Sequence, residues 1–398
     1  MKDKLLTSFL FAAVLVALTS TAIASTTWYV NGVSGSNSNT CTSPTTACKT
    51  VSHAGSLAAS GDSIRVAAAT YTENLTISIS LKILGSAAST TIIDGGGVGT
   101  VVTVSSAAAN VSLSRVTIRN GRALSGGGIR NLGTLTLNNS IIANNRALIG
   151  GGITNGGGTA IISNSTVQFN YASVPCSSVC LTLARGGGIL NGASGVLRIS
   201  KSTISQNTAY SPIPPTGPFG SYGGGIDNAG TAIISNSTIS ANSARVGAYY
   251  LGAGGGFNNG GTVIISNGTL GNNTGGGVRN STGSATIQNS IIAYNSRGNC
   301  FGTMTSNGYN LSSDDTCNFT STGDLNNTNP MLGPLQYNGG PTQTTALPSG
   351  SPAVDAGNPN GCTDGLGHLL KTDQRGKPRP DTEDTGGCDM GAYERQSD

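Results

Sequence analysis

Gly126-Gly127-Gly128-Ile129-Arg130-Asn131 opens a pattern that recurs through the middle of the chain. An alternating run, Thr134-Leu135-Thr136-Leu137, follows it and is typical of a half-buried strand. The Gly-rich opening occurs at Gly126, Gly150, Gly186, Gly223, Gly254 and Gly275. The spacings are 24, 36, 37, 31 and 21 residues, and the short values leave room for three short strands but for no crossover helix. The pattern therefore predicts an all-β protein, a parallel β-helix of three-strand coils rising ~4.8 Å per coil.

Asparagine closes each copy of the pattern, at Asn145, Asn170, Asn207, Asn242, Asn273 and Asn295. Because an Asn amide can bond the Asn of the next coil, this file of residues predicts a hydrogen-bonded ladder. A second file lies six residues earlier, at Asn139, Asn164, Asn236, Asn267 and Asn289, with Lys201 as its exception. Gly supplies positive φ at the corners. We interpret these Gly and Asn residues as structural rather than as ligands.

Three insertions lengthen the long copies. They are residues 174–183, residues 211–221, which are rich in Pro, and residues 246–251, which hold Tyr249 and Tyr250. Insertions at corresponding points of a repeat emerge on one face, which is often the working face. We therefore expect this face to carry the function.

The N-terminus predicts export. Lys2 and Lys4 precede an apolar run, and Ala22-Ile23-Ala24 fits a small-x-small cleavage site. We expect residues 1–24 to be a signal peptide, with an uncleaved anchor as the alternative, and we expect no transmembrane segment in the mature chain. Residues 25–299 are then the β-helix, in which a short helix within residues 49–60 caps the first coil. Residues 300–398, where the repeat dissolves, form an irregular C-terminal capping region.

The eight cysteines fall into four sequence-local pairs, which suits an exported protein. We predict the disulfides Cys41–Cys48, Cys176–Cys180, Cys300–Cys317 and Cys362–Cys388. A metal site is the competing interpretation, and it lacks both a CxxC pair and a nearby cluster of His. We expect no metal at these cysteines.

Charge is distributed unevenly along the chain. Between Gly95 and Ser313 the only acid is Asp227, against eleven Arg or Lys, whereas twelve acids face five bases from Asp314 onward. A basic body suggests an anionic partner such as an acidic polysaccharide or a cell-envelope glycan, and no feature favours nucleic acid. The candidate ligand-binding residues are Asp227, Arg130, Arg185, Arg245, Arg279, Tyr249 and Tyr250.

Several stretches resemble known families. Gly61-Asp62-Ser63-Ile64 to Tyr71-Thr72-Glu73 is similar to the entry coil of right-handed β-helix proteins of the pectin-lyase-like superfamily. The repeats resemble the GGxI units of chlamydial polymorphic outer-membrane proteins. In the tail, Asn338–Thr342, Gly350–Asp355, Asp373–Pro380 and Asp389–Glu394 resemble the bacterial choice-of-anchor Q domain. These resemblances imply a right-handed single-stranded β-helix, export and surface association, but no known reaction.

Three functions follow as hypotheses. The first is a secreted or cell-surface rod for adhesion or carbohydrate binding, without catalysis. The second is a pectate-lyase-like polysaccharide lyase or a hydrolase of acidic glycans, but hydrolysis needs two carboxyl groups ~5–9 Å apart and Asp227 has no acidic neighbour in the next copies. The third is a structural surface-layer element. We expect no cofactor; Ca²⁺ at Asp314-Asp315 or at residues 381–384 is the alternative.

Overall fold

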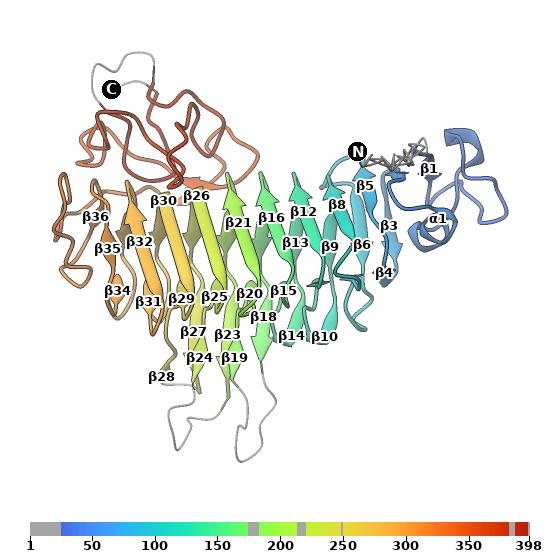
Figure 1. Cartoon of the computed structure of the whole chain (residues 1–398), viewed down its shortest axis with the longest axis horizontal. Coiled ribbons are helices and arrows are strands. Elements are labelled where there is room, and N and C mark those ends of the chain that lie inside the picture. The colour runs from blue at the N-terminus through green and yellow to red at the C-terminus, as the bar shows by residue number, and fades with distance from the viewer. Residues whose placement is uncertain (1–24, 174–182, 213–219, 248–249, 382–386, 397–398) are drawn as a thin grey trace, which may run out of the picture.

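The computed structural model describes residues 25–173, 183–212, 220–247, 250–381 and 387–396. They form a right-handed parallel β-helix, as predicted, in which three parallel sheets run along one elongated stack (Figure 1). Four predicted features lie outside these residues: the signal peptide, the Cys176–Cys180 bridge, Tyr249 and residues 382–384. Within the described residues no helix has the length and apolar character needed to span a bilayer.

Sheet B contains the strand that follows each Gly-rich opening. Its strands are β4 (Leu75–Ile77), β7 (Val102–Val104), β11 (Ile129–Asn131), β15 (Ile153–Asn155), β20 (Ile189–Asn191), β25 (Ile226–Asn228), β29 (Phe257–Asn259), β31 (Val278–Asn280) and β34 (Cys300–Phe301). Each strand pairs in parallel with the strand of the next coil, so equivalent positions of successive copies stack in register.

Sheet A receives two consecutive segments from most coils. Its strands are β1 (Thr27–Val30), β2 (Ser63–Val66), β3 (Ala69–Thr72), β5 (Leu81–Gly85), β6 (Thr91–Asp94), β8 (Asn110–Ser114), β9 (Thr117–Arg119), β12 (Thr134–Asn138), β13 (Ile141–Ala143), β16 (Thr159–Ser163), β17 (Thr166–Gln168), β21 (Val196–Ser200), β22 (Thr203–Ser205), β26 (Thr231–Ser240), β30 (Thr262–Gly271), β32 (Ser284–Gln288), β33 (Ile291–Ala293), β35 (Thr305–Ser306) and β36 (Leu311–Ser312). In β26 and β30 the two segments merge into one long strand.

Sheet C closes each coil. Its strands are β10 (Arg122–Ser125), β14 (Arg146–Ile149), β18 (Tyr171–Ser173), β19 (Ala184–Arg185), β23 (Thr208–Ser211), β24 (Ser221–Tyr222), β27 (Ser243–Val246) and β28 (Tyr250–Leu251). The last pair, β27 and β28, is antiparallel, because β28 turns back along β27.

The core is built from alternate residues of most strands. In sheet B the file Ile129, Ile153, Ile189, Ile226 and Phe257 is fully buried. The inner file of sheet C is alanine at Ala147, Ala172, Ala209 and Ala244, all buried. Burying one Ile side chain contributes roughly 1.5–3 kcal/mol, so the stacked files dominate the stability of the rod.

The Gly and Asn files have different roles at the corners of the coils. The first Gly of each opening is left-handed, with φ of +63° at Gly126 and +61° at Gly186. Asn145, Asn170, Asn207, Asn242, Asn273 and Asn295 form a buried ladder, in which each Nδ2 donates to the Oδ1 of the next at 2.9–3.1 Å. The left-handed corner residue precedes each ladder Asn, as at Gln206 with φ of +56°, so the ladder Asn supplies hydrogen bonds and its neighbour supplies the turn.

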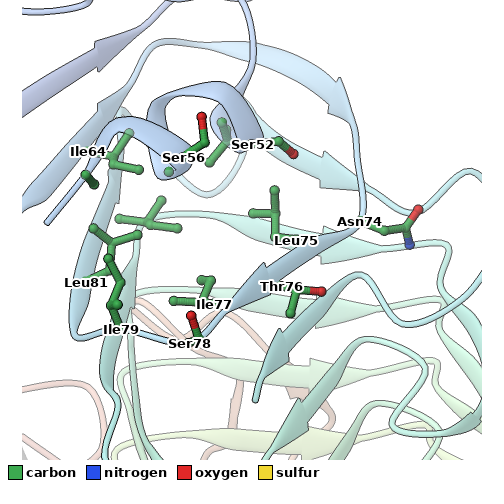
Figure 2. Close-up of a pocket in the computed structure, with 14 residues that line it drawn as sticks. Ser52, Ser56, Ile64, Asn74, Leu75, Thr76, Ile77, Ser78, Ile79 and Leu81 are labelled. Carbon is green, nitrogen blue, oxygen red and sulfur yellow. The ribbon is translucent and has the colours of Figure 1, made fainter. Parts of the chain in front are cut away.

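The N-terminal cap is the short helix α1 (Val51–Leu57), preceded by the 3₁₀ turn η1 (Pro44–Thr46). Glu73 fixes α1, since its carboxylate accepts the amides of Val51 at 2.9 Å and Ser52 at 2.7 Å. A pocket of about 480 Å³ remains between α1 and the first coil, and Figure 2 shows Leu75 and Ile77 lining it. The helix therefore covers the end of the core only in part.

The irregular C-terminal region has two parts. Residues 300–329 add the last short strands and extend the stack, whereas residues 330–396 turn back along the side of the rod (Figure 1). This second part includes the small hairpin of β37 (Leu335–Gln336) and β38 (Thr344–Thr345). It packs against the second file of the sequence pattern: Asn236 donates to the carbonyl of Thr372 at 2.7 Å and Asn267 to that of Thr363 at 2.6 Å. The second part thus covers a flank of the rod rather than its end.

The exception in that file, Lys201, takes part in the same contact. Its ammonium donates to Thr372 Oγ1 at 2.6 Å, and its backbone is left-handed like that of the Asn residues. Three of the four predicted disulfides, Cys41–Cys48, Cys300–Cys317 and Cys362–Cys388, are confirmed. The last of them closes a loop within the part that lies on the flank.

Candidate functional site

The three insertions all fall between strands of sheet C. Residues 174–183 separate β18 from β19, residues 212–220 separate β23 from β24, and residues 247–249 separate β27 from β28. We call the outer surface of sheets B and C the insertion face, defined by Arg122, Arg130, Arg146, Tyr171, Arg185, Tyr210, Tyr222, Asp227, Arg245, Asn258, Arg279 and Phe301. Figure 1 shows the strands of sheet C next to those of sheet B.

Asp227 lies at the centre of this face and is completely buried. Its carboxylate accepts a hydrogen bond from Arg185 Nε at 2.5 Å, and the other oxygen accepts one from Asn258 Nδ2 at 2.6 Å. Arg185 stands at the end of β19, one coil before Asp227, and Asn258 occupies the same position as Asp227 in the next coil. The ion pair therefore joins residues 42 positions apart in the sequence.

Arg279 extends this network by one further coil. Its Nη1 donates to Asn258 Oδ1 at 3.1 Å, so the amide of Asn258 bridges Asp227 and Arg279. The guanidinium of Arg279 also lies over two rings, 5.2 Å from the centroid of Tyr222 and 5.8 Å from that of Phe301. Such cation–π contacts hold the guanidinium in place at an accessible surface.

Burial raises the pKa of the Asp227 carboxyl, and the charges of Arg185 and Arg279 with the hydrogen bond from Asn258 oppose the shift. A buried carboxylate needs such partners, because desolvating a lone charge costs several kcal/mol. Its two oxygens are occupied by Arg185 and Asn258 in this arrangement. Asp227 is therefore placed to orient these side chains rather than to meet a ligand itself.

On sheet C, aromatic side chains lie beside basic ones in neighbouring coils. The guanidinium of Arg146 lies 5.0 Å from the ring centroid of Tyr171, and the rings of Tyr171 and Tyr210 are 6.2 Å apart. Arg245 pairs in register with Tyr210 and donates from Nε to Ser243 Oγ at 2.8 Å. Flat rings beside guanidinium groups suit a ligand that has both apolar faces and negative charge.

Two hollows occur at the ends of the insertion face. One, of about 890 Å³, is open and is lined by Arg122, Arg130 and the exposed side chains of Val98 and Leu124. The other, of about 220 Å³, is lined by Arg279, Arg297, Phe301 and several glycines. Arg130 and Arg279 occupy the same file of sheet B, five coils apart. At ~4.8 Å per coil, roughly 24 Å separate their backbones along the rod.

The structure thus brings together Arg185, Asp227 and Arg279 among the candidates chosen from sequence. Arg245 and Arg130 lie on the same face but outside that network. Tyr250 belongs to β28, and Tyr249 is outside the described residues. The choice of candidates missed Asn258, Tyr222, Phe301, Tyr171, Tyr210 and Arg146. Aligning the copies on their Gly openings places Asn258 in the file of Asp227, whereas Phe301 joins that file only through the strand pairing.

Of the two acidic stretches considered for Ca²⁺, the structure describes Asp314-Asp315 in full. Asp314 uses its carboxylate inside the protein: Oδ1 accepts from the amide and hydroxyl of Thr316, and Oδ2 accepts from the amide of Asn299 at 3.0 Å. Its oxygens therefore fix the turn that follows β36. Of the second acidic stretch, only Asp381 belongs to the described residues, where it is buried.

Comparison with known proteins gives the fold. No family model and no curated protein matches the sequence. Among solved structures, the GH136 lacto-N-biosidase from Eubacterium ramulus aligns over 72% of this chain and 63% of its own at 11% identity, with a TM-score of 0.41. Pectate lyase Pel9A aligns over 94% of this chain and 98% of its own at 16% identity, with a TM-score of 0.60. At this identity the likeness shows the fold alone: the chain shares the right-handed parallel β-helix fold of this pectate lyase.

Proposed function

We propose that the protein is an exported rod that binds an acidic polysaccharide along the insertion face without cleaving it. The observation that carries the proposal is the distribution of charge. Of the eleven Lys and Arg residues between Gly95 and Ser313, six lie on strands of sheets B and C. They are Arg122, Arg130, Arg146, Arg185, Arg245 and Arg279. The single acid on these strands, Asp227, is buried and neutralised by Arg185.

The geometry supports a long, linear ligand. The cations are spread along the rod: Arg122 and Arg146 occupy successive coils of sheet C, whereas Arg130 and Arg279 lie five coils apart in sheet B. Tyr171 and Tyr210 add flat apolar surfaces beside them, which favours a sugar polymer over a simple polyanion. The fold of a pectate lyase is compatible with a polysaccharide ligand.

Retention in native gels that contain polygalacturonate or alginate tests the proposal, with neutral galactan as the comparison. We expect retention only by the acidic polymers, weakening as salt is added because the charges are exposed. The double variant Arg130→Ala/Arg146→Ala should lose retention, whereas Arg198→Ala, which removes an exposed charge from sheet A, should keep it. The absence of retention by any acidic polymer, or equal losses in both variants, would contradict the proposal.

A polysaccharide lyase is the second candidate, favoured by the shared fold with a pectate lyase. Proton abstraction would then need a base on the insertion face. Asp227 is held by Arg185 and Asn258, and Asp94 is paired with Arg119 in sheet A. The two remaining carboxylates of the described β-helix also accept hydrogen bonds within the protein, Asp62 from Trp28 and Glu73 from the amides that begin α1. Unsaturated ends released from polygalacturonate, measured by ultraviolet absorbance, would establish this candidate in place of pure binding.

Association with the cell surface is part of the proposal and rests on the tail motifs. The segments that resemble the choice-of-anchor Q domain lie in the part that packs along the flank of the rod. Fractionation of cells that express the full chain would show whether it remains on the surface or is released. Self-association of the purified protein would instead favour the surface-layer alternative.

A further inference from the structure

The backbone ladder of the glycine corners breaks at the last two openings, which begin at Gly254 and Gly275. In four successive coils the first Gly donates its amide to the residue before the next opening: Gly126 to Ile149, Gly150 to Arg185, Gly186 to Tyr222 and Gly223 to Ala253. At Gly254 the equivalent acceptor would be the carbonyl of Thr274, which instead accepts from the amide of Ala244 at 2.9 Å. Among the described residues, the amide of Gly254 therefore has no backbone acceptor, and the amide of Gly276, in the next opening, has none either.

The break coincides with a feature of the sequence. The unit that begins at Gly254 is the shortest of those between the Gly-rich openings, at 21 residues. Its successor also turns differently, with φ of +98° at Gly275 and +102° at Gly276, where the earlier first glycines have φ near +60°. Backbone amides that lack a protein acceptor can donate hydrogen bonds to a bound anion.

These two glycines line the hollow of about 220 Å³ at the end of the insertion face, together with Arg279 and Phe301. A Cβ on Gly276 would meet nothing closer than 3.8 Å, so the space beside its backbone is open. Phe301 exposes 67% of its surface at the rim. The hollow thus combines backbone donors, a guanidinium and an aromatic wall.

Neighbouring side chains fix the position of the Arg279 guanidinium. Asp227 fixes Asn258, and Asn258 accepts the single hydrogen bond that Arg279 donates among the described residues, from Nη1. The remaining N–H groups of Arg279 are available, and a planar guanidinium binds a carboxylate through two parallel hydrogen bonds. Tyr222 and Phe301 restrict its position from the sides.

We infer that this hollow is a subsite for one hexuronate residue of an acidic polysaccharide. Arg279 binds the carboxylate, the amides of Gly254 and Gly276 donate to its oxygens, and Phe301 contacts the sugar ring. Asp227 and Asn258 are positioning residues that act through Arg279. The inference rests on the proposed function, because it names the place where one sugar of the same polymer is recognised.

The test uses tri-galacturonate and its fully methyl-esterified form, titrated into the full chain by calorimetry. The wild type should bind the free acid more tightly than the ester. Arg279→Ala should weaken binding of the acid by roughly 10- to 100-fold and remove the discrimination, because a hydrogen bond to a charged group is lost. Arg279→Lys should retain part of the affinity, and Asn258→Ala should lose several-fold for the acid with no change for the ester.

Arg198→Ala is the matched control and should bind both trimers as the wild type does. Circular dichroism of each variant separates loss of binding from loss of fold, and Arg279→Lys keeps the inference testable if the Ala variant unfolds. Retention of polygalacturonate together with unchanged affinity of Arg279→Ala for the acid would overturn the subsite and leave the proposed function standing. Failure of the wild type to bind either polygalacturonate or the trimer would overturn both.

Discussion

Replacing Asn207 by Ala removes one rung from the middle of the buried ladder. Asn207 has no exposed surface, and its Nδ2 donates to Asn242 Oδ1 at 3.0 Å and to the carbonyl of Val167 at 2.9 Å. Its Oδ1 accepts from both the amide and the Nδ2 of Asn170 at 3.0 Å. In the variant, Asn170 Nδ2 can still donate to the carbonyl of Ile142, whereas the backbone amide of Asn170 loses its acceptor.

The variant therefore leaves two buried groups without this partner, the amide of Asn170 and the carbonyl of Val167. At about 1–3 kcal/mol for each, the free energy of unfolding should fall by roughly 2–6 kcal/mol. Urea denaturation with the disulfides intact measures this loss from the shift in midpoint at constant slope.

Asn272→Ala is the matched control. Asn272 is exposed and left-handed, with φ of +58°, and the equivalent corner of the preceding coil is already Ala241 at +57°. We expect a loss below about 1 kcal/mol, since alanine evidently fits this corner and no side-chain bond is removed. Equal losses in the two variants, or a loss below about 1 kcal/mol for Asn207→Ala, would refute the view that the ladder stabilises the rod.

Three further outcomes follow from buried groups elsewhere. Burial raises the pKa of Glu394 to about 7 from its ordinary 4.5, so the stability that this group contributes is full below the ordinary value and is lost as pH rises through about 7. After correction for intrinsic rates, amides of the C-terminal region should exchange hydrogen faster at about pH 8 than at about pH 5. Glu394→Gln should remove this difference. The same pH dependence in the variant as in the wild type would contradict the assignment to Glu394. Gly187→Ala places a Cβ 2.4 Å from a carbonyl oxygen of the next coil, so it should lower the free energy of unfolding by about 1–3 kcal/mol. In Gly157→Ala the added Cβ meets nothing closer than 3.9 Å, so this control variant should keep the stability of the wild type. Similar melting curves for the two variants would count against close stacking of the coils. Glu73→Ala removes the carboxylate oxygens that accept the amides of Val51 and Ser52 at the start of α1. The variant should speed the hydrogen exchange of that helix alone. A uniform effect along the rod would show that the cap and the coils unfold together.

Much of the architecture was predictable from the sequence, because each copy repeats the same local pattern of strands and corners. The period of 21 to 24 residues sets the length of a coil, and the alternation within Thr134–Leu137 sets which side chains enter the core. The position of Asn207 relative to its copy was sufficient to place it in a ladder. Cysteines that are close in sequence were paired correctly in three cases, since short loops close at low entropic cost.

The site itself depended on the stacking register, which joins residues that the insertions separate in the chain. Arg185 and Asp227 are 42 residues apart, and only the coil that brings β19 beside β25 makes them partners. The same holds for Lys201, which breaks the Asn file because it contacts Thr372, 171 residues later.

The sequence by itself therefore determined the coil, its inward and outward residues and its corners, since these follow from short-range periodicity and backbone conformation. The tertiary structure decided which outward residues share a face, where the tail packs, and where the glycine ladder breaks. Each of these depends on how coils of unequal length align across the stack, and that alignment is a property of the whole rod.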